Sequence, residues 1–279
     1  MGRNRLLLLA AALLFSTGGA AIKATSLTSW QVACFRSAVA AVAILALVPS
    51  ARRAWTWRSV VASLAYAATM VLFVSANKLT TSANAIFLQD TAPLYLLLLG
   101  PWLLGERLRR ADLLLAATLA LGMALFFLGA ERAAATAPDP FRGNLIAAFS
   151  GLAWALTIAG LRWIGRSDGA GLPAVVAGNV IACLGCLPMA LPVAHAGWTD
   201  AAAVVYLGVF QIGLAYACLT RAIRHVPAFE ASAVLLAEPA MNPVWAFLVH
   251  GERPGAWAVA GGALILGATL ANTWWHRRG

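Results

Sequence analysis

Long apolar runs separated by short polar segments dominate the chain. A hydrocarbon core about 30 Å thick requires about 20 consecutive apolar residues per helix, and ten runs approach that length. They cover residues 6–22, 30–48, 59–77, 83–104, 113–128, 145–164, 172–193, 201–219, 231–249 and 256–274. The longest connection is the segment at 133–140. The pattern predicts an all-α integral membrane protein with ten transmembrane helices and no separate soluble domain.

The composition supports this interpretation and excludes several functions. Of 279 residues, 62% are hydrophobic and 11% charged, whereas soluble proteins average about 25% charged residues. The net charge of +10 comes from basic residues scattered in ones to threes, so no nucleic-acid-binding face is expected. The four cysteines lie inside apolar runs, which disfavours a disulfide framework or a metal site. Without a P-loop, HExxH or GxSxG motif, we expect no cofactor, no catalytic residues and no enzymatic activity.

Basic residues divide unequally between the two sides of the predicted helices. Fourteen lie on the side of the N-terminus and five on the opposite side. Because Lys and Arg accumulate in cytoplasmic loops, both termini are expected in the cytoplasm. The alanine- and arginine-rich composition is typical of a GC-rich bacterium, which predicts a multi-pass protein of the bacterial inner membrane.

An internal repeat divides the chain into two halves. Pro93 followed by Gly-Glu-Arg at 105–107 recurs, at an offset of 146, as Pro239 followed by Gly-Glu-Arg at 251–253. A weaker match relates Phe15 to Trp154 on the first run of each half.

The predicted halves are residues 1–137 and 138–279, with five spans each. Since five is odd, the second half must cross the membrane upside down relative to the first. Inverted repeats are typical of alternating-access transporters, whose substrate site lies near the midplane where the repeats meet.

On these repeated motifs the whole chain resembles the drug/metabolite transporter superfamily, in particular the ten-helix EamA-like exporters and among them the bacterial aromatic amino-acid exporters. The resemblance implies ten helices around a central cavity and export of small organic solutes. Small four-helix multidrug relatives carry a carboxylate on the first helix, whereas this chain has Phe15, Ser16 and Thr17 there. Efflux of lipophilic cations through such a carboxylate is therefore not expected.

Ionisable residues inside the spans are the first candidates for the site. Each costs about 2.5–3.5 kcal/mol to insert and therefore tends to face a cavity or a partner. We expect Lys78 or Arg36 to face a substrate carboxylate, unless these side chains reach the membrane surface instead. Asp90, Glu238 or Gln211 would face a substrate ammonium group.

Aromatic and sulfur-containing residues are the second group. Trp154 is a tryptophan at the centre of a span, where its ring would form a cavity wall. Tyr66, Met70 and Phe73 share one helical stripe. Both features suit either a cavity lining or ordinary helix packing.

Three prolines lie within the predicted spans. Pro93, Pro239 and Pro243 each remove a hydrogen bond and free a carbonyl four residues earlier. They are interpreted either as hinges or as static bends.

Together these features predict an exporter of amino acids, aromatic and other apolar ones preferred, that works by alternating access in the lipid bilayer as a monomer. The alternatives are export of another small metabolite or drug and, in a different class, a lipid flippase or integral membrane enzyme. Proton coupling, for which Glu238 is a better candidate than Asp90, and facilitated diffusion are both compatible with the sequence.

Overall fold

The computed structural model describes residues 2–53, 55–103, 110–128, 133–165, 171–222 and 234–275. In chain order its helices are α1 (Arg3–Ser16), α2 (Gly18–Lys23), α3 (Ser29–Leu47), the 3-10 helix η1 (Pro49–Arg52), α4 (Trp57–Leu79), α5 (Ser82–Gln89), α6 (Ala92–Leu103), α7 (Arg110–Leu128), α8 (Pro140–Gly165), α9 (Gly171–Ala190), α10 (Trp198–Tyr206), the π-helix η2 (Leu207–Leu214), α11 (Ala215–Ala222), α13 (Ala237–His250) and α14 (Ala256–Trp275). Within the described ranges these helices build ten spans, which confirms the predicted all-α fold.

The outer surface suits a lipid environment. Six helical segments are long and apolar enough to cross a membrane, and two shorter apolar helices accompany them. Large apolar side chains such as Leu114 and Leu248 lie mostly exposed on the outside of the bundle. Near one helix end, Trp57 and Trp163 pack edge to face with ring centroids 5.2 Å apart, and Arg58 lies over both rings, as in an interfacial aromatic belt.

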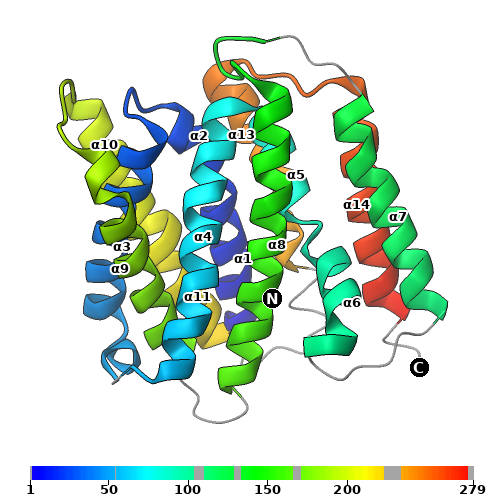
Figure 1. The fold of residues 1–279 in the computed structure, drawn as a ribbon, viewed down its shortest axis with the longest axis horizontal. Helices are drawn as coiled ribbons and strands as arrows, with labels where there is room; N and C mark the ends of the chain where they lie inside the picture. The colour runs from blue at the N-terminus through cyan, green and yellow to red at the C-terminus, as the bar shows by residue number, and fades with distance from the viewer. Residues whose placement is uncertain are drawn as a thin grey trace.

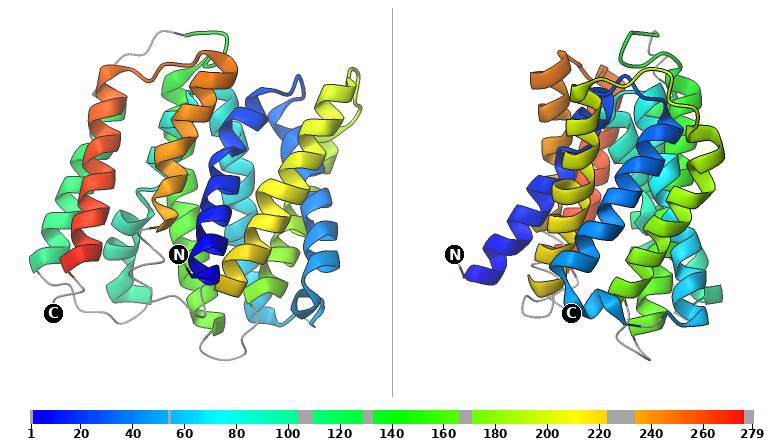
Figure 2. Two further views of the ribbon diagram at one scale, coloured as in Figure 1. Left: turned by 180° about the vertical axis from the view of Figure 1, so that it is seen from behind. Right: turned by 90° about the vertical axis from the view of Figure 1, so that its left-hand side faces the viewer.

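The helices form one bundle in which α4 contacts α8 and α9, α3 contacts α9 and η2, and α7 pairs with α14 (Figure 1). Figure 2 shows α1 and α11 between α3 on one side and α13 on the other. Helix α1 begins and α14 ends at the same end of the bundle, here named the terminal end. At the opposite end α4 and α13 finish and α8 begins.

Three spans that the apolar pattern predicts as continuous are interrupted. The first divides into α1 and α2 at Thr17, whose Oγ1 lies 3.0 Å from the Tyr206 hydroxyl. The fourth divides into α5 and α6 at Asp90 and Thr91, and the eighth contains η2. Broken helices are tolerated in membranes only where protein or a cavity surrounds the exposed backbone, so these interruptions point to the interior.

The three prolines Pro93, Pro239 and Pro243 were predicted to remove a hydrogen bond inside a continuous helix. The structure shows a different arrangement for two of them. Pro93 and Pro239 occupy the first turns of α6 and α13, where a missing N–H costs no helical hydrogen bond. Pro243, in contrast, lies in the interior of α13, beyond its first turn. The chain therefore restarts a helix at Pro93 instead of bending one.

A close contact between α4 and α9 depends on Gly178. A Cβ atom added there would lie 2.5 Å from Cδ1 of Tyr66 and 3.1 Å from the Ser63 carbonyl oxygen. We expect Gly178→Ala to lower the free energy of unfolding by about 1–3 kcal/mol, because a buried ring and a backbone must separate. Gly185→Ala in the same helix is the matched control, since its Cβ would meet nothing within 4 Å. Thermal unfolding in detergent measures both variants, and equal melting temperatures would contradict the prediction.

Candidate substrate-binding site

A cavity of about 330 Å³ lies between the two halves of the bundle. Its walls include the middle of α4 at 69–73, of α8 at 154–158 and of α14 at 265–269. The helix breaks also contribute, through Asp90, the first turn of α13 and η2. Cavities of about 300–1,000 Å³ are typical of small-molecule sites, so the space fits a solute of amino-acid size.

Arg36 of α3 contributes a buried positive charge to the cavity wall. Its side chain is 1% exposed, and Nη2 donates a hydrogen bond to the Met70 carbonyl at 3.1 Å. Nε has no hydrogen-bond partner, and no carboxylate of the described residues lies within ion-pair distance. A guanidinium held in this way is stabilised by an anion that enters the cavity.

Gln211 adds an unpaired acceptor beside the same helix. It lies in η2, is 6% exposed and lines the cavity, and its Oε1 atom has no hydrogen-bond donor. Gly208, three residues earlier, packs on α3: an added Cβ would lie 2.9 Å from the Arg36 carbonyl oxygen. The wide turn of a π-helix is frequently found at functional sites, and here it places an amide at the cavity.

Two carboxylates belong to another part of the wall. Asp90 caps the C-terminus of α5, and Glu238 lies in the first turn of α13 beside Pro239. Both line the cavity, and the charge of Asp90 acts on Glu238. No hydrogen bond to either carboxylate is formed among the described residues. The pair therefore depends on a proton or another cation for compensation.

Aromatic side chains cover the remaining wall. Phe15 and Trp154, the residues matched by the weak sequence repeat, both line the cavity together with Phe73 and Tyr216. Phe15 packs edge to face on Tyr216 with ring centroids 5.2 Å apart. This surface suits an aromatic or aliphatic group of a ligand. Met70 also belongs to the wall.

Two residues predicted to bind substrate, Tyr66 and Lys78, do not line the cavity. Tyr66 is 1% exposed and packs behind Tyr216, where its hydroxyl accepts a hydrogen bond from Asn179 Nδ2 at 3.1 Å. Lys78 Nζ donates to the carbonyl and hydroxyl oxygens of Thr25 at 2.7 and 2.9 Å, toward the opposite end. Pro243, which was predicted as a hinge and not as a wall residue, lies inside α13 and does not line the cavity either. Met70 and Phe73 of the predicted stripe line the cavity, whereas Tyr66 lies about one turn of α4 beyond it.

The wall also includes residues that were not predicted to contact substrate. Phe15 is one, and its repeat match to Trp154 was the available signal. Gln89 and Thr69 are others; Gln89 Nε2 donates to Ser150 Oγ at 2.8 Å and so joins α5 to α8. Polar residues of this kind occur throughout the spans, so pattern alone did not separate them from packing.

Comparison with known proteins identifies the family. The profile of the EamA-like transporter family matches residues 4–128 and again residues 141–274. A solved structure titled "Crystal structure of protein" is similar at 22% sequence identity over 99% of this chain and 98% of that chain, with a TM-score of 0.66, which shows a shared fold. No curated protein matches. The chain belongs to the EamA-like transporter family and is a multi-pass membrane transporter of a small molecule, not an enzyme.

Proposed function

We propose that the protein exports amino acids, aromatic and other apolar ones preferred, across the bacterial inner membrane by alternating access. One observation carries the proposal: the apolar cavity holds a buried guanidinium and a buried amide oxygen for which the described residues supply neither a counter-ion nor a donor. These groups are Arg36 and Gln211. A zwitterionic amino acid supplies both partners: a carboxylate for the guanidinium and an ammonium group for the amide oxygen.

Each part of an apolar amino acid has a complement in this cavity. The substrate carboxylate accepts charge-assisted hydrogen bonds from Arg36, for which a planar guanidinium is well suited. The ammonium group donates to Gln211 Oε1. The side chain packs on Phe15, Phe73 and Trp154. Of the two cations that the sequence offered for the carboxylate, Arg36 is favoured over Lys78 because Lys78 is bound to Thr25.

The charge distribution supports one orientation of the bundle in the membrane. Arg52 and Arg221 lie at helix ends of the terminal end, whereas Lys23 and Lys78 lie at the opposite end. The terminal end therefore faces the cytoplasm in this proposal. The opposite end is named the external end below.

The halves 1–137 and 138–279 would move relative to each other during transport, with Pro93, Pro239 and Pro243 near the moving joints. Both halves contribute to the cavity wall, so a single chain supplies a complete site. This supports function as a monomer.

Counterflow into liposomes tests the proposal. Purified protein is reconstituted, the vesicles are loaded with unlabelled phenylalanine, and uptake of labelled phenylalanine, tryptophan, methionine and a sugar is followed without an ion gradient. Uptake of the amino acids but not of the sugar is expected. Uptake of none of the amino acids by folded, inserted protein would leave an EamA-family exporter of another metabolite or drug.

A further inference from the structure

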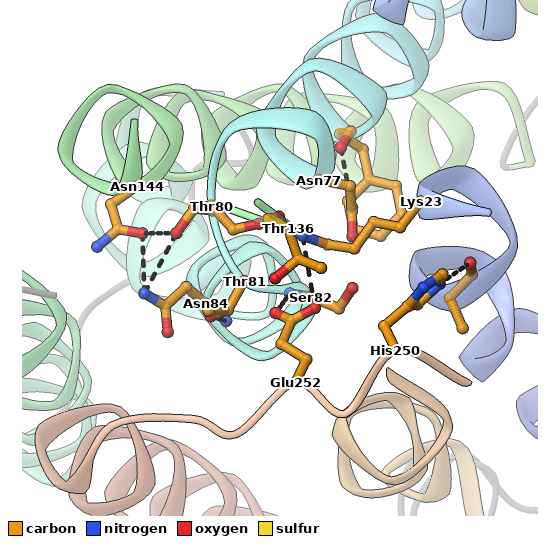
Figure 3. A network of polar contacts seen from close by, with 12 residues as sticks. Lys23, Asn77, Thr80, Thr81, Ser82, Asn84, Thr136, Asn144, His250 and Glu252 are labelled. Atoms are coloured by element: carbon orange, nitrogen blue, oxygen red, sulfur yellow. Dashed lines mark hydrogen bonds and ion pairs between the residues drawn. The ribbon is translucent and has the colours of Figure 1, made fainter. Parts of the chain in front are cut away.

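A buried ion pair joins the two halves at the external end (Figure 3). Lys23, the last residue of α2, places Nζ 3.4 Å from Oε2 of Glu252, and both side chains are 4% exposed. Glu252 belongs to the second copy of the repeated Gly-Glu-Arg motif; the first copy, at 105–107, lies outside the described residues. The repeated glutamate in the second half thus has a partner in the first.

Both members of the pair also hold backbone groups. Lys23 Nζ donates to the carbonyl of Thr80 at 2.7 Å and to that of Thr136. Glu252 Oε1 accepts from the backbone N–H of Ser82, at the start of α5, at 2.6 Å. Four segments therefore converge on one pair of charges: α2, the α4–α5 turn, the segment before α8 and the segment after α13 (Figure 3).

The layer next to the ion pair is tightly packed. A Cβ added at Gly19 of α2 would lie 2.8 Å from both Asn242 Oδ1 and Ser82 Oγ. His250 Nε2 lies 2.8 Å from the Ala20 carbonyl oxygen. Among the described residues, none within 16–35, 74–88 or 240–264 lines the cavity. The cavity is therefore closed toward the external end by the elements that the ion pair ties together.

A polar closure of this kind is suited to opening. Two charges removed from water gain little net stability from each other, because desolvation offsets their attraction. When the segments separate, water hydrates both ions in place of the lost contact. Burial raises the pKa of Glu252, whereas Lys23 and the Ser82 N–H act in the other direction. Removal of one partner leaves the other charge buried and uncompensated, which favours separation.

We propose that Lys23 and Glu252 form the external gate of the transporter: their contact closes the cavity to the outside, and its rupture opens the release path. The inference rests on the proposed function for the direction of transport. The residues act by positioning the two halves and do not touch substrate. Loss of either charge shifts the population toward the outward-open conformation.

A cysteine in the cavity reports on this population without any substrate. Ile158→Cys places a thiol on the part of the cavity wall that the middle of α8 forms, in a background in which the native cysteines are replaced by alanine. Labelling by a membrane-impermeant thiol reagent is measured in right-side-out and inside-out vesicles. Glu252→Gln and Lys23→Met are each expected to raise labelling from outside by about tenfold and to lower labelling from inside. Asp139→Asn is the matched control, because this exposed carboxylate at the same end caps only the N–H of Arg142.

Unchanged labelling in both gate variants, at wild-type abundance, would overturn the proposal. If a single variant is absent from the membrane, the double variant Lys23→Met/Glu252→Gln decides, since no buried charge is left uncompensated in it; raised outside labelling supports the gate and unchanged labelling overturns it. Raised labelling without amino-acid counterflow would retain the gate and reject the proposed substrate.

Discussion

Arg36→Gln is expected to lower the rate of phenylalanine counterflow by about a hundredfold, which corresponds to about 2.7 kcal/mol. The variant removes the positive charge that is buried in the cavity wall with an unpartnered Nε atom. Its one backbone contact is the hydrogen bond to the Met70 carbonyl. Because an uncompensated buried charge does not stabilise the fold, abundance and melting temperature should not fall with the rate.

A pair of substrates separates recognition of the carboxylate from a general defect. Phenethylamine is phenylalanine without its carboxylate, so wild-type protein should prefer phenylalanine and Arg36→Gln should lose that preference. Arg52→Gln is the control, since this exposed arginine near the end of α3 donates to the Leu45 carbonyl away from the cavity. An equal loss of both substrates would assign Arg36 a structural role. Full activity of the variant with phenylalanine would contradict the proposed contact.

The apolar pattern located the spans closely because bilayer thickness fixes the length of an apolar run. The run at 30–48 corresponds to α3 (Ser29–Leu47), and the run at 113–128 ends with α7 at Leu128. The pattern did not reveal the interruptions inside such runs. Asp90 and Thr91 form a short polar step that ends two residues before Pro93, but whether such a proline bends one helix or starts a new one depends on the packing around it.

Sequence reasoning pointed to the types of residue in the candidate site but not to their arrangement in space. Charge inside a span directed attention to Arg36, Asp90 and Glu238, because each is costly in lipid unless a cavity compensates it, and all three line the cavity. The same reasoning included Lys78, whose partner Thr25 lies 53 residues earlier in the chain. Hydrogen bonds over such separations leave no periodic trace in a sequence.

Tyr66 illustrates the corresponding limit for aromatic residues. It shares the stripe of Met70 and Phe73, which both reach the cavity. Its ring nevertheless lies behind Tyr216, against the space left by Gly178. Which layer a side chain occupies depends on the neighbouring helix, and that information belongs to the contact between α4 and α9 rather than to either helix alone.

The carboxylate pair carries the second large prediction. Asp90 and Glu238 line one apolar cavity, and each adds a negative charge there. Two like charges in low dielectric favour retention of a proton by one of them. Exchange of that proton for substrate would couple transport to a pH gradient. We expect a gradient of one pH unit, acidic inside the liposome, to drive accumulation of phenylalanine up to about tenfold in wild-type protein.

Glu238→Gln is expected to abolish this accumulation while counterflow continues, because glutamine mimics the protonated carboxyl and keeps its shape but releases no proton. Asp90→Asn should weaken the accumulation in the same direction. The exposed carboxylate variant Asp139→Asn serves as the control and should retain the wild-type response. Wild-type uptake that only equilibrates phenylalanine across the membrane, whatever the pH gradient, would indicate facilitated diffusion. Gradient-driven accumulation in a double variant, Asp90→Asn/Glu238→Gln, would place the coupling proton on another group, since neither carboxylate then remains to carry it.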